Sequence, residues 1–489
     1  MGIGRRSRVY TGRGGTLERI RFGTSGWRGI IADDFTFENV RICAQSAADY
    51  LNGAGLAHRG LVVGYDTRFA SEDFAAVAAE VVAANGIRVY FCQQAVPIPI
   101  ISYAILVQQA GGAIVITASH NAASWNGFKY KLENASSASP EVVAELERHI
   151  SRIQAGGIVK QIPLDQALKE GIVTKFDPSP PYIQHIGELV DLERLRYSGL
   201  KVVVDSMYGA GIGYLHSILS GGTTQVTEIH GKRNPLFPGL QPEPIALNLG
   251  ELSVTVKEDG ASVGLATDGD ADRIGIMDER GEYLTTLQVF ALLALYLLEI
   301  CEKRGAIVKT ITQTSMLYLL GELYGVPVDE TPVGFKYVAP KMLAEDALIG
   351  GEESGGYAYR GHIPERDGIL SGLLFIDLMV RKQKSPSQLL EYLYSKVGPH
   401  YYKRIDIEFP ASEREVITHR LNMSRPSHIK NTAVTGIETS DGFRFLLADR
   451  NWLLIRFSGT EPILRVYAES DSIARVDGFL QAGREMLGI

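Results

Sequence analysis

Residues Lys201–Gly211 read KVVVDSMYGAG, and this stretch decides the fold. An apolar, β-branched run without polar alternation ends here in a polar, glycine-containing loop, and a helix-like segment follows. The same pattern occurs in LVVGYDTR (Leu61–Arg68) and in AIVKTITQTS (Ala306–Ser315). Runs of this kind suit strands that are covered on both faces, as in a parallel or mixed sheet flanked by helices. The sequence therefore predicts three α/β units in series.

The chain changes character after about Gly398. The segments YKRIDIEF, GFRFLLADR and ILRVYAES alternate between apolar and polar residues, as strands of a half-exposed antiparallel sheet do. A chain of 489 residues is also too long for a single core. We predict an α/β protein of three topologically similar domains with mixed sheets (residues 1–178, 179–284 and 285–398), followed by a smaller α+β domain (residues 399–489). The segment FDPSPP, rich in proline, marks the first boundary.

Composition excludes several classes of partner. Lys and Arg total 49 against 56 Asp and Glu, so the formal net charge is -7 and does not attract nucleic acid to the molecule as a whole. Cys43, Cys92 and Cys301 lack CxxC spacing, which argues against a disulfide framework or a zinc site and suits a reducing compartment. The longest apolar stretch, Val289–Ile300, is too short to span a bilayer. We expect a cytoplasmic protein that binds neither nucleic acid nor a membrane.

An acidic loop gives the strongest local signal. In TDGDADR, the alternate carboxylates of Asp268, Asp270 and Asp272 can converge on one cation, and hard oxygen ligands suit Mg²⁺ or Ca²⁺. A solvated acidic turn is one alternative. An EF-hand loop is another, because Glu279 falls at its twelfth position, but Arg273 stands at the sixth, where glycine is required. The flanking residues also read as strands and not as helices.

A second polar loop follows the predicted strand in AIVITASHN. It places Ser119 and His120 at the carboxyl end of that strand, where ligands of open α/β sheets collect, and Asn121 and Lys129 follow. A serine without an acid and base triad can carry a phosphoryl group if a metal and cations offset the phosphate charge. The alternative is a polar loop whose serine caps a helix and whose histidine is merely hydrogen-bonded.

Phosphate binding is predicted near the carboxyl end of the chain. In RFSGTEP, the turn amides, the hydroxyls of Ser458 and Thr460, and the guanidinium of Arg456 form a phosphate cradle. A plain hairpin turn would use similar residues. Arg465, on the next predicted strand, adds a second cationic contact or is simply exposed.

Three more segments allow both a functional and a purely structural interpretation. The loop RFGTSGWRG, which ends with Arg28, folds around phosphate or serves as a connector. TPVGFKY and GGEESGGYAYRGHIPERDGIL provide carboxylates and glycines that permit close backbone approach. Glu352 and Glu353 can accept hydrogen bonds from neighbouring sugar hydroxyls, and the alternative is a solvated acidic loop.

Together, GTSGWRG, TASHN…NGFK, DGDADR, GEESGG and RFSGTEP, in this order, closely resemble the α-D-phosphohexomutase family, and its phosphoglucomutase branch most. The resemblance runs from Arg21 to about Glu469. It implies four domains around a central cleft, with one loop from each domain facing a hexose phosphate. It also implies interconversion of glucose 1-phosphate and glucose 6-phosphate, one Mg²⁺ per chain, glucose 1,6-bisphosphate as activator, and a monomer or homodimer.

The resemblance assigns roles to individual residues. Ser119 is the phosphoserine and shares the metal with Asp268, Asp270 and Asp272. The implied catalytic residues, which stabilise the transferring phosphoryl group or assist proton transfer, are Ser119, Arg28, Arg273, His120 and Lys129. The implied substrate-binding residues are Thr331, Gly334, Glu352, Ser354, Arg366, Arg456, Ser458, Gly459, Thr460 and Arg465.

The sequence departs from the family pattern at two positions. Ala122 stands where proline is common, which should change loop stiffness more than chemistry. Gly356 stands where bifunctional phosphomannomutase-type members often carry histidine, which favours the glucose branch and leaves open whether His362 substitutes. The remaining alternatives are a phosphomannomutase or bifunctional mutase, a phosphoglucosamine mutase, a metal-dependent sugar phosphatase and a non-catalytic sugar-phosphate-binding protein.

Overall fold

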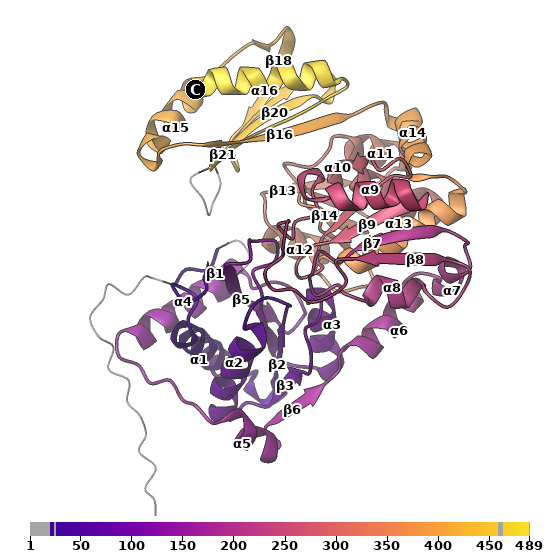
Figure 1. Ribbon diagram of the computed structural model, residues 1–489. Coiled ribbons are helices and arrows are strands. Elements are labelled where there is room, and N and C mark those ends of the chain that lie inside the picture. Colours follow the sequence, from indigo (N-terminus) through magenta and orange to yellow (C-terminus); the bar gives the residue numbers. More distant parts are fainter. Residues whose placement is uncertain (1–19, 24–25, 458–462, 489) are drawn as a thin grey trace, which may run out of the picture.

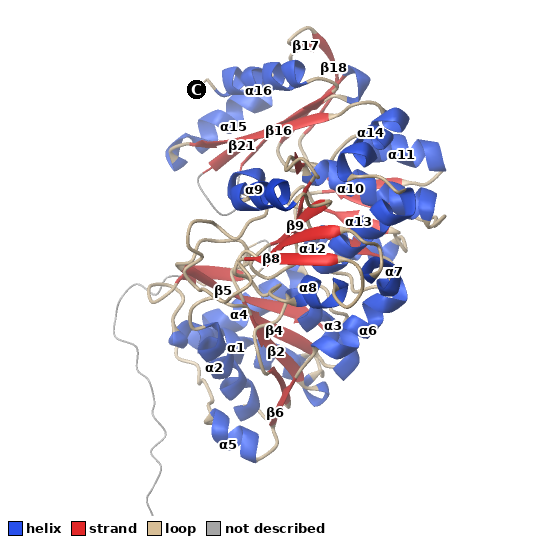
Figure 2. Ribbon diagram, turned by 45° about the vertical axis from the view of Figure 1, so that its right-hand side comes forward, coloured by secondary structure: helices blue, strands red, loops and turns tan. Residues whose placement is uncertain are grey.

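The computed structural model describes residues 20–23, 26–457 and 463–488. It contains three α/β domains with mixed sheets and a C-terminal domain with an antiparallel sheet (Figures 1 and 2), which confirms the predicted fold class. Domain I lies at the bottom of Figure 1 and domain IV at the top, with domains II and III between them. Three predicted site residues, Ser458, Gly459 and Thr460, lie outside the described residues.

Domain I is built on a six-stranded sheet of order β1-β5-β4-β2-β3-β6. Its strands are β1 (Trp27–Ile30), β2 (Leu61–Tyr65), β3 (Val89–Cys92), β4 (Gly112–Ile116), β5 (Trp125–Leu132) and β6 (Val173–Phe176). Its helices are α1 (Phe37–Gly53), η1 (Ala57–Arg59), α2 (Ser71–Ala84), α3 (Ile98–Gln108), α4 (Pro140–Gln154) and α5 (Leu164–Lys169). β2 and β4 are buried at every position, because helices cover both faces of the sheet, as their continuous apolar runs predict.

Domain II has a five-stranded sheet of order β11-β10-β9-β7-β8. Its strands are β7 (Lys201–Asp205), β8 (Gln225–Ile229), β9 (Val263–Thr267), β10 (Ile274–Met277) and β11 (Tyr283–Leu284). Its helices are α6 (Ser179–Leu189), α7 (Leu192–Arg196), α8 (Tyr214–Leu219), η2 (Ala246–Asn248) and α9 (Gly250–Asp259). Gly260 ends α9 in the left-handed conformation that favours glycine.

Domain III has a four-stranded sheet of order β13-β12-β14-β15. Its strands are β12 (Ile307–Thr310), β13 (Val328–Thr331), β14 (Ile349–Gly351) and β15 (Tyr357–Tyr359). Its helices are α10 (Thr286–Leu295), the π-helical turn η3 (Tyr296–Ile300), α11 (Met316–Tyr324), α12 (Phe335–Ala344), α13 (Gly368–Lys382) and α14 (Pro386–Val397). Thr285 and Gln288 form a capping box that starts α10, a helix whose residues are nearly all buried.

Domain IV has a six-stranded antiparallel sheet of order β16-β21-β20-β19-β18-β17. Its strands are β16 (Tyr401–Glu408), β17 (His428–Ile429), β18 (Thr432–Glu438), β19 (Phe443–Leu447), β20 (Trp452–Phe457) and β21 (Ile463–Ser470). Its helices are η4 (Ala411–Glu413), α15 (Arg414–Met423), η5 (Ala448–Arg450) and α16 (Ile473–Leu487). Figure 1 shows α16 lying along one face of this sheet.

Domains I, II and III share one strand arrangement, although their sequences repeat only weakly. The orders β5-β4-β2-β3, β10-β9-β7-β8 and β15-β14-β12-β13 agree, and each begins with an antiparallel hairpin followed by two parallel pairings. The hairpin loops carry Ser119 in domain I, Asp268–Asp272 in domain II and Glu352–Ser354 in domain III. The strands that flank the acidic loop also show that the EF-hand alternative, which needs helices there, is wrong.

The packing separates domain IV from the rest. One continuous apolar core runs through domains I, II and III, whereas domain IV has a core of its own. A small cluster joins domain IV to domain III through Ile311, Val333, Tyr402, Trp452, Leu454 and Tyr467. We propose domain boundaries at residues 178, 284 and 398, each of which falls between the last element of one domain and the first of the next.

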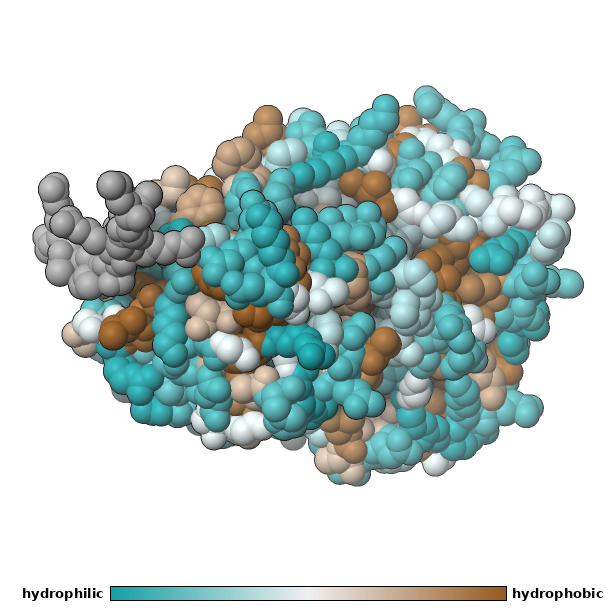
Figure 3. All heavy atoms as spheres, turned by 90° about the horizontal axis from the view of Figure 1, so that it is seen from below, coloured by the Kyte–Doolittle hydropathy of each residue, from teal (hydrophilic) through white to brown (hydrophobic). Residues whose placement is uncertain are grey.

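The face seen in Figure 3 is mainly hydrophilic, with apolar side chains scattered over it. Among the described residues, no helix combines the length and the apolar character that a membrane span requires.

Candidate active site

Residues of all four domains line a cleft of about 1680 Å³. Arg28 of domain I, Arg273 of domain II, Glu352 of domain III and Arg465 of domain IV all line it. Its walls also include His120, Ser354, Arg366 and Arg456. The cleft is therefore rich in groups that suit an anionic, hydroxylated ligand.

Ser119 lies in the loop between β4 and β5, directly before the cleft residue His120, but is not itself among the residues that line the cleft. Its side chain is 1% exposed, and its backbone has a left-handed φ of 54°. The backbone N–H of Ser119 donates to Thr117 Oγ1 over 2.8 Å, and Ser119 Oγ donates to Asp268 Oδ2 over 2.9 Å. The loop joins two strands, so Ser119 caps no helix, contrary to the alternative interpretation of this segment.

The serine loop and the acidic loop approach so closely that glycine is required. A Cβ on Gly269 would lie 2.3 Å from the carbonyl oxygen of Ser119, which is far inside contact distance. Gly209 supports the acidic loop from the other side, since a Cβ there would lie 2.9 Å from Asp268 O. Any larger side chain at Gly269 would push the two loops apart.

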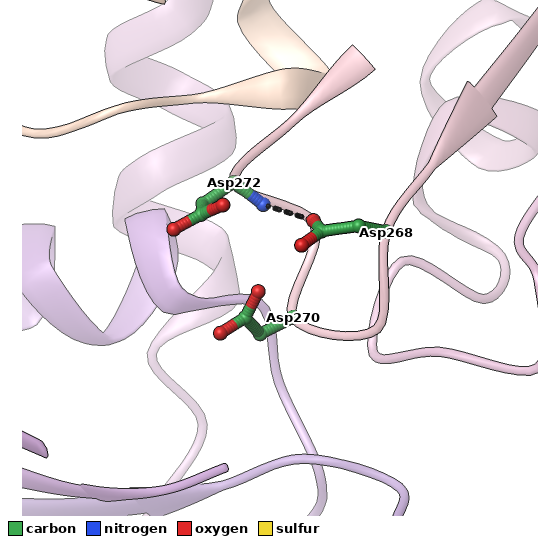
Figure 4. Close-up of side chains that lie close together, drawn as sticks. All are labelled: Asp268, Asp270 and Asp272. Carbon is green, nitrogen blue, oxygen red and sulfur yellow. Dashed lines mark hydrogen bonds between the residues drawn. The ribbon is translucent and has the colours of Figure 1, made fainter. Parts of the chain in front are cut away.

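Asp268, Asp270 and Asp272 form a buried cluster that could hold a metal ion (Figure 4). One oxygen from each lies within 4.8 Å of the others. Burial and the two neighbouring carboxylates raise the pKa of Asp268 well above its usual range. Within the described chain, Asp270 Oδ1 and Asp272 Oδ1 are buried without a hydrogen-bond partner. The set fits a hard divalent cation, and the solvated-turn alternative is wrong because all three side chains are buried.

Lys129 lies beside this cluster. Its Nζ donates to Asp270 Oδ2 over 2.8 Å, and Thr117 Oγ1 donates to the same oxygen over 3.2 Å. Burial alone would raise the pKa of Asp270, but the charge and hydrogen bond of Lys129, together with Asp268 and Arg366, outweigh burial and lower it. Lys129 therefore helps to keep one of the three carboxylates ionised.

Arg28, His120 and Arg273 surround the serine on the cleft side. Arg28 Nη1 donates to Asn121 Oδ1 over 2.5 Å, and His120 Nδ1 lies 3.4 Å from Ser119 Oγ. Burial and the nearby Arg273 lower the pKa of Arg28 to about 10. Burial, Arg273 and Arg28 also lower the pKa of His120 well below its usual value, so its imidazole is neutral at pH 7. The concentration of positive charge suits a phosphate dianion.

Arg68 is a residue of this site that the sequence did not reveal. Its fully buried guanidinium donates to four carbonyl oxygens of the serine loop, those of Ser119, Asn121, Ala122 and Trp125. Asp66 provides the countercharge at 3.2 Å. The residue ends the segment LVVGYDTR, which indicated a strand and a polar loop but not what the arginine would contact.

Glu352 and Arg366 connect the loop between β14 and β15 to the aspartate cluster. Arg366 contacts Asp272 at 2.7 Å, Glu352 at 3.2 Å and Glu365 at 3.2 Å. Glu352 is buried, so the solvated-loop alternative is wrong for this residue. Ser354 Oγ is buried and has no hydrogen-bond partner in the described part of the chain. This hydroxyl is thus available to a ligand in the cleft.

The structure explains the glycine at position 356. A Cβ on Gly356 would lie 2.3 Å from Cδ of Arg366, so the arginine occupies the space that a side chain would need. His362 does not replace the missing histidine. Its side chain is fully buried, contacts Asp367 at 2.9 Å and stacks on His185, away from the residues that line the cleft.

Some of the other predicted substrate-binding residues line the cleft, and some do not. Thr331 and Gly334 are buried and do not line the cleft, whereas the intervening Val333 does. Arg456 and Arg465 line the cleft from β20 and β21. Arg465 is half-buried, so the alternative that it is simply exposed is wrong.

Three further cleft residues escaped the sequence analysis, namely Lys336, Tyr402 and Arg404. Lys336 belongs to TPVGFKY, where a cation two residues after Gly334 was a usable signal. Tyr402 and Arg404 lie in YKRIDIEF, whose alternation indicates a strand but not which face of that strand meets domain III. Only the packing of domain IV on domain III supplies that information.

Comparison with known proteins agrees with this geometry. Four family profiles match the chain in order, described as phosphoglucomutase/phosphomannomutase alpha/beta/alpha domain I (residues 19–156), domain II (180–281), domain III (286–397) and C-terminal domain (419–485). A phosphoglucomutase/phosphomannomutase of Thermococcus kodakarensis is 30% identical over 95% of this chain and 98% of its own length. A probable phosphoglucosamine mutase of Methanothermobacter thermautotrophicus is 32% identical over 92% and 93%.

A solved structure extends the likeness to three dimensions. A protein of Thermus thermophilus that carries a phosphomannomutase name superposes with a TM-score of 0.83 at 32% identity, covering 96% of this chain and 99% of that one. The fold and the site thus define an isomerase of the phosphohexomutase class. The chain belongs to the phosphoglucomutase/phosphomannomutase family, which confirms the resemblance found in the sequence.

Proposed function

We propose that this protein is a phosphoglucomutase, which interconverts glucose 1-phosphate and glucose 6-phosphate through a phosphorylated Ser119. The observation that carries the proposal is the placement of Ser119 Oγ, 2.9 Å from Asp268 in the buried aspartate cluster. A phosphoryl carrier needs charge compensation on every side, and here carboxylates positioned for a cation and the arginines of the cleft supply it.

The transfer uses one serine and two sugar oxygens. In the first step, O6 of glucose 1-phosphate attacks the phosphorus, the bond to Ser119 Oγ breaks, and glucose 1,6-bisphosphate forms. In the second, Ser119 Oγ attacks the phosphorus on O1, and glucose 6-phosphate leaves. In each step the attacking hydroxyl loses a proton and the departing oxygen gains one, so protons balance over the cycle. An enzyme that has lost its phosphate needs glucose 1,6-bisphosphate as activator.

The residues around Ser119 have distinct tasks in this scheme. Arg28 and Arg273 hold the equatorial oxygens of the transferring group. His120, neutral and 3.4 Å from Ser119 Oγ, can accept or return a proton. The ammonium of Lys129, paired with Asp270, assists electrostatically or donates a proton. Asp268, Asp270 and Asp272 would hold one Mg²⁺ together with a phosphoserine oxygen. When bound, Mg²⁺ supplies Lewis-acid polarisation of the phosphoryl oxygens.

Two features support glucose as the substrate, and the first of them argues against an amino sugar. Glu352 contacts Arg366 at 3.2 Å, and Glu353 contacts Arg404 at 3.3 Å, so both carboxylates of the sugar loop already have cationic partners. An ammonium group at C2 would have to compete with those arginines, whereas a neutral hydroxyl would not. Gly356, the departure from the histidine of bifunctional members, also supports the glucose branch. Phosphomannomutase, bifunctional mutase and phosphoglucosamine mutase are the alternatives.

Other parts of the proposal rest on less specific observations. Free Cys43 and Cys92, both buried, support a cytoplasmic location. We expect a monomer or a homodimer.

Intact-protein mass spectrometry tests the phosphoserine. We expect one phosphate on the wild-type chain and on Ser124→Ala, whose exposed side chain lies in the same loop. Ser119→Ala should carry none and should lose mutase activity. A fully active Ser119→Ala variant would refute the proposal. Phosphate release without isomerised sugar would instead indicate a phosphatase, and substrate binding without turnover a binding protein.

Substrate identity is tested separately. Initial rates should be compared on the 1-phosphates of glucose, mannose and glucosamine with the same enzyme preparation. We expect the highest kcat/KM on glucose 1-phosphate. A higher value on mannose or glucosamine 1-phosphate would move the assignment to the corresponding branch while leaving the Ser119 chemistry in place.

A further inference from the structure

Asp441 bridges domains III and IV at the predicted phosphate site. It lies in the turn between β18 and β19. Its Oδ1 accepts a hydrogen bond from Arg456 Nε over 2.9 Å, and its Oδ2 accepts one from the backbone N–H of Val333 over 2.8 Å. One carboxylate thus holds both a phosphate-binding arginine of domain IV and the backbone of a domain III loop.

That loop, TPVG, is fixed to domain IV by packing as well. Val333 lies against an apolar cluster that includes Trp452, Leu454 and Tyr467 of domain IV. The loop belongs to TPVGFKY, in which the family resemblance assigns substrate binding to Thr331 and Gly334. Its position relative to Arg456 is therefore set by two independent contacts, one apolar and one polar.

Asp406 makes a second, similar connection. It lies on β16 directly opposite Arg465 on β21, with 3.6 Å between its Oδ2 and Arg465 Nε. Its Oδ1 lies 2.9 Å from Arg404 Nε, and Arg404 Nη1 contacts Glu353 Oε1 at 3.3 Å. Tyr402 also donates to that Glu353 oxygen, over 2.7 Å. Asp406 thus links Arg465 to the sugar loop GEESGG.

The register of the sheet explains why both carboxylates are present. Arg456 and Arg465 are direct cross-strand partners on β20 and β21. Like charges at such positions repel, and long arginine side chains have many rotamers. Asp441 and Asp406 each contact Nε, at the base of the guanidinium, which restricts the directions in which the two arginines can point. Binding a ligand then costs less conformational entropy, because the two arginine side chains are already partly ordered.

We propose that Asp441 and Asp406 are positioning residues that set the distance between the phosphate-binding arginines of domain IV and the sugar-recognising loops of domain III. The inference rests on the proposed function, since it assigns phosphate binding to Arg456 and Arg465. A mutase must bind its intermediate in two orientations, so the same arginines must hold either distal phosphate while the same loops contact the ring. Two carboxylates that connect both arginines to both sugar loops fix the position of the phosphate site relative to those loops.

Binding and turnover of Asp441→Ala and Asp406→Ala test the proposal. We expect the Kd for glucose 6-phosphate and the KM for glucose 1-phosphate to rise about tenfold, as for loss of a charge-assisted contact, with kcat changed much less. The preference for glucose over mannose 1-phosphate should fall several-fold. Asp441→Asn, which retains an acceptor for Val333, should show a smaller effect. Glu485→Gln, which alters an exposed pair with Lys430, should match the wild type.

Two controls separate the possible failures. If Arg456→Gln leaves glucose 6-phosphate binding unchanged, the phosphate role of domain IV in the proposed function is wrong. If Arg456→Gln weakens binding but both aspartate variants bind as the wild type does, the positioning inference is overturned. Hydrogen exchange gives a readout without activity, because Asp441→Ala should speed exchange at Val333 while β20 stays protected. Unchanged exchange at Val333 would also overturn the inference.

Discussion

Ser119 Oγ donates a hydrogen bond of 2.9 Å to Asp268 Oδ2, although 149 residues separate the two in sequence. The two residues lie in topologically equivalent hairpin loops, one in domain I and one in domain II. Gly269 permits the approach, because a Cβ there would lie 2.3 Å from Ser119 O. The site therefore exists only when the two domains are docked, and its geometry depends on backbone contacts as much as on the reacting side chains.

Replacing Asp272 with asparagine should remove the response of the protein to Mg²⁺. A cation that binds only the native state at 100 times its Kd stabilises the fold by about 2.7 kcal/mol, and the variant lacks one of three carboxylate ligands. Thermal melting with and without Mg²⁺ measures the effect. After chelation the variant should lose little stability, because relief of carboxylate repulsion offsets the weaker contact of the asparagine with Arg366, which keeps Glu352 and Glu365 as partners. The exposed Asp259→Asn in the same domain should retain the full shift, and a full shift in Asp272→Asn would contradict the metal assignment.

Arg68→Lys should slow catalysis without weakening substrate binding. A lysine ammonium cannot reach the four carbonyls that the guanidinium of Arg68 contacts, and each buried carbonyl left unpaired costs about 1–3 kcal/mol. The loop should shift, and a displacement of about 1 Å at a reacting group costs about 100-fold in rate. Steady-state kinetics should show a lower kcat at nearly constant KM. Arg148→Lys, on the exposed face of α4, is the control. An unchanged kcat in Arg68→Lys would show that the serine loop keeps its conformation without the Arg68 contacts.

The fold class and the family could be read from the sequence, whereas the support of the site could not. Continuous apolar runs such as that before Asp205 predict buried strands, because helices cover both faces of the sheet. The acidic loop was recognisable because its chemistry lies in consecutive residues. The contacts of Arg68 were not recognisable, because it joins two loops of domain I that meet only in the folded sheet. Those of Asp441 were not recognisable, because it joins segments of two domains that meet only after the domains pack. The similar topology of domains I to III was predicted, but the order of the strands within each sheet was not, since strand order leaves little periodic signal in the sequence.

Glu330 should make the docking of domain IV sensitive to acid. It contacts Lys309 at 3.0 Å and pairs with Arg444 of domain IV. Burial would raise the pKa of Glu330, but Lys309 and Arg444 outweigh burial and lower it to about 2 from 4.5. A lowered carboxyl pKa contributes stability above the unfolded value, and this contribution is lost as the pH falls from about 4.5 to about 2. The shift corresponds to about 3 kcal/mol.

Urea unfolding at pH 7 and pH 3 measures this contribution. Glu330→Gln should lower the urea midpoint at pH 7 and reduce the difference between the two pH values, because the buried cations lose their partner in either case. Glu345→Gln, which removes an exposed pair with Lys341, should behave as the wild type. An equal drop in midpoint from pH 7 to pH 3 in the wild type and in Glu330→Gln would show that other carboxylates dominate the acid response.

Gly356→His should impair the enzyme, although family members of the bifunctional type carry histidine there. A Cβ at Gly356 would lie 2.3 Å from Cδ and 2.8 Å from Cγ of Arg366, so the arginine must move. Its contacts with Asp272 and Glu352 would then be lost, leaving buried carboxylates without their cation. We expect at least a tenfold lower kcat/KM on glucose 1-phosphate, on the scale of about 1.4 kcal/mol per factor of ten.

The matched control for this prediction is Gly187→Ala. Its Cβ would meet nothing closer than 3.5 Å, on the exposed side of α6, so activity should be unchanged and stability equal or slightly higher. Rates on mannose 1-phosphate complete the comparison. If Gly356→His kept its activity on glucose 1-phosphate and gained activity on the mannose substrate, Arg366 would have an alternative position, and the glycine would act as a specificity switch and not as a steric requirement.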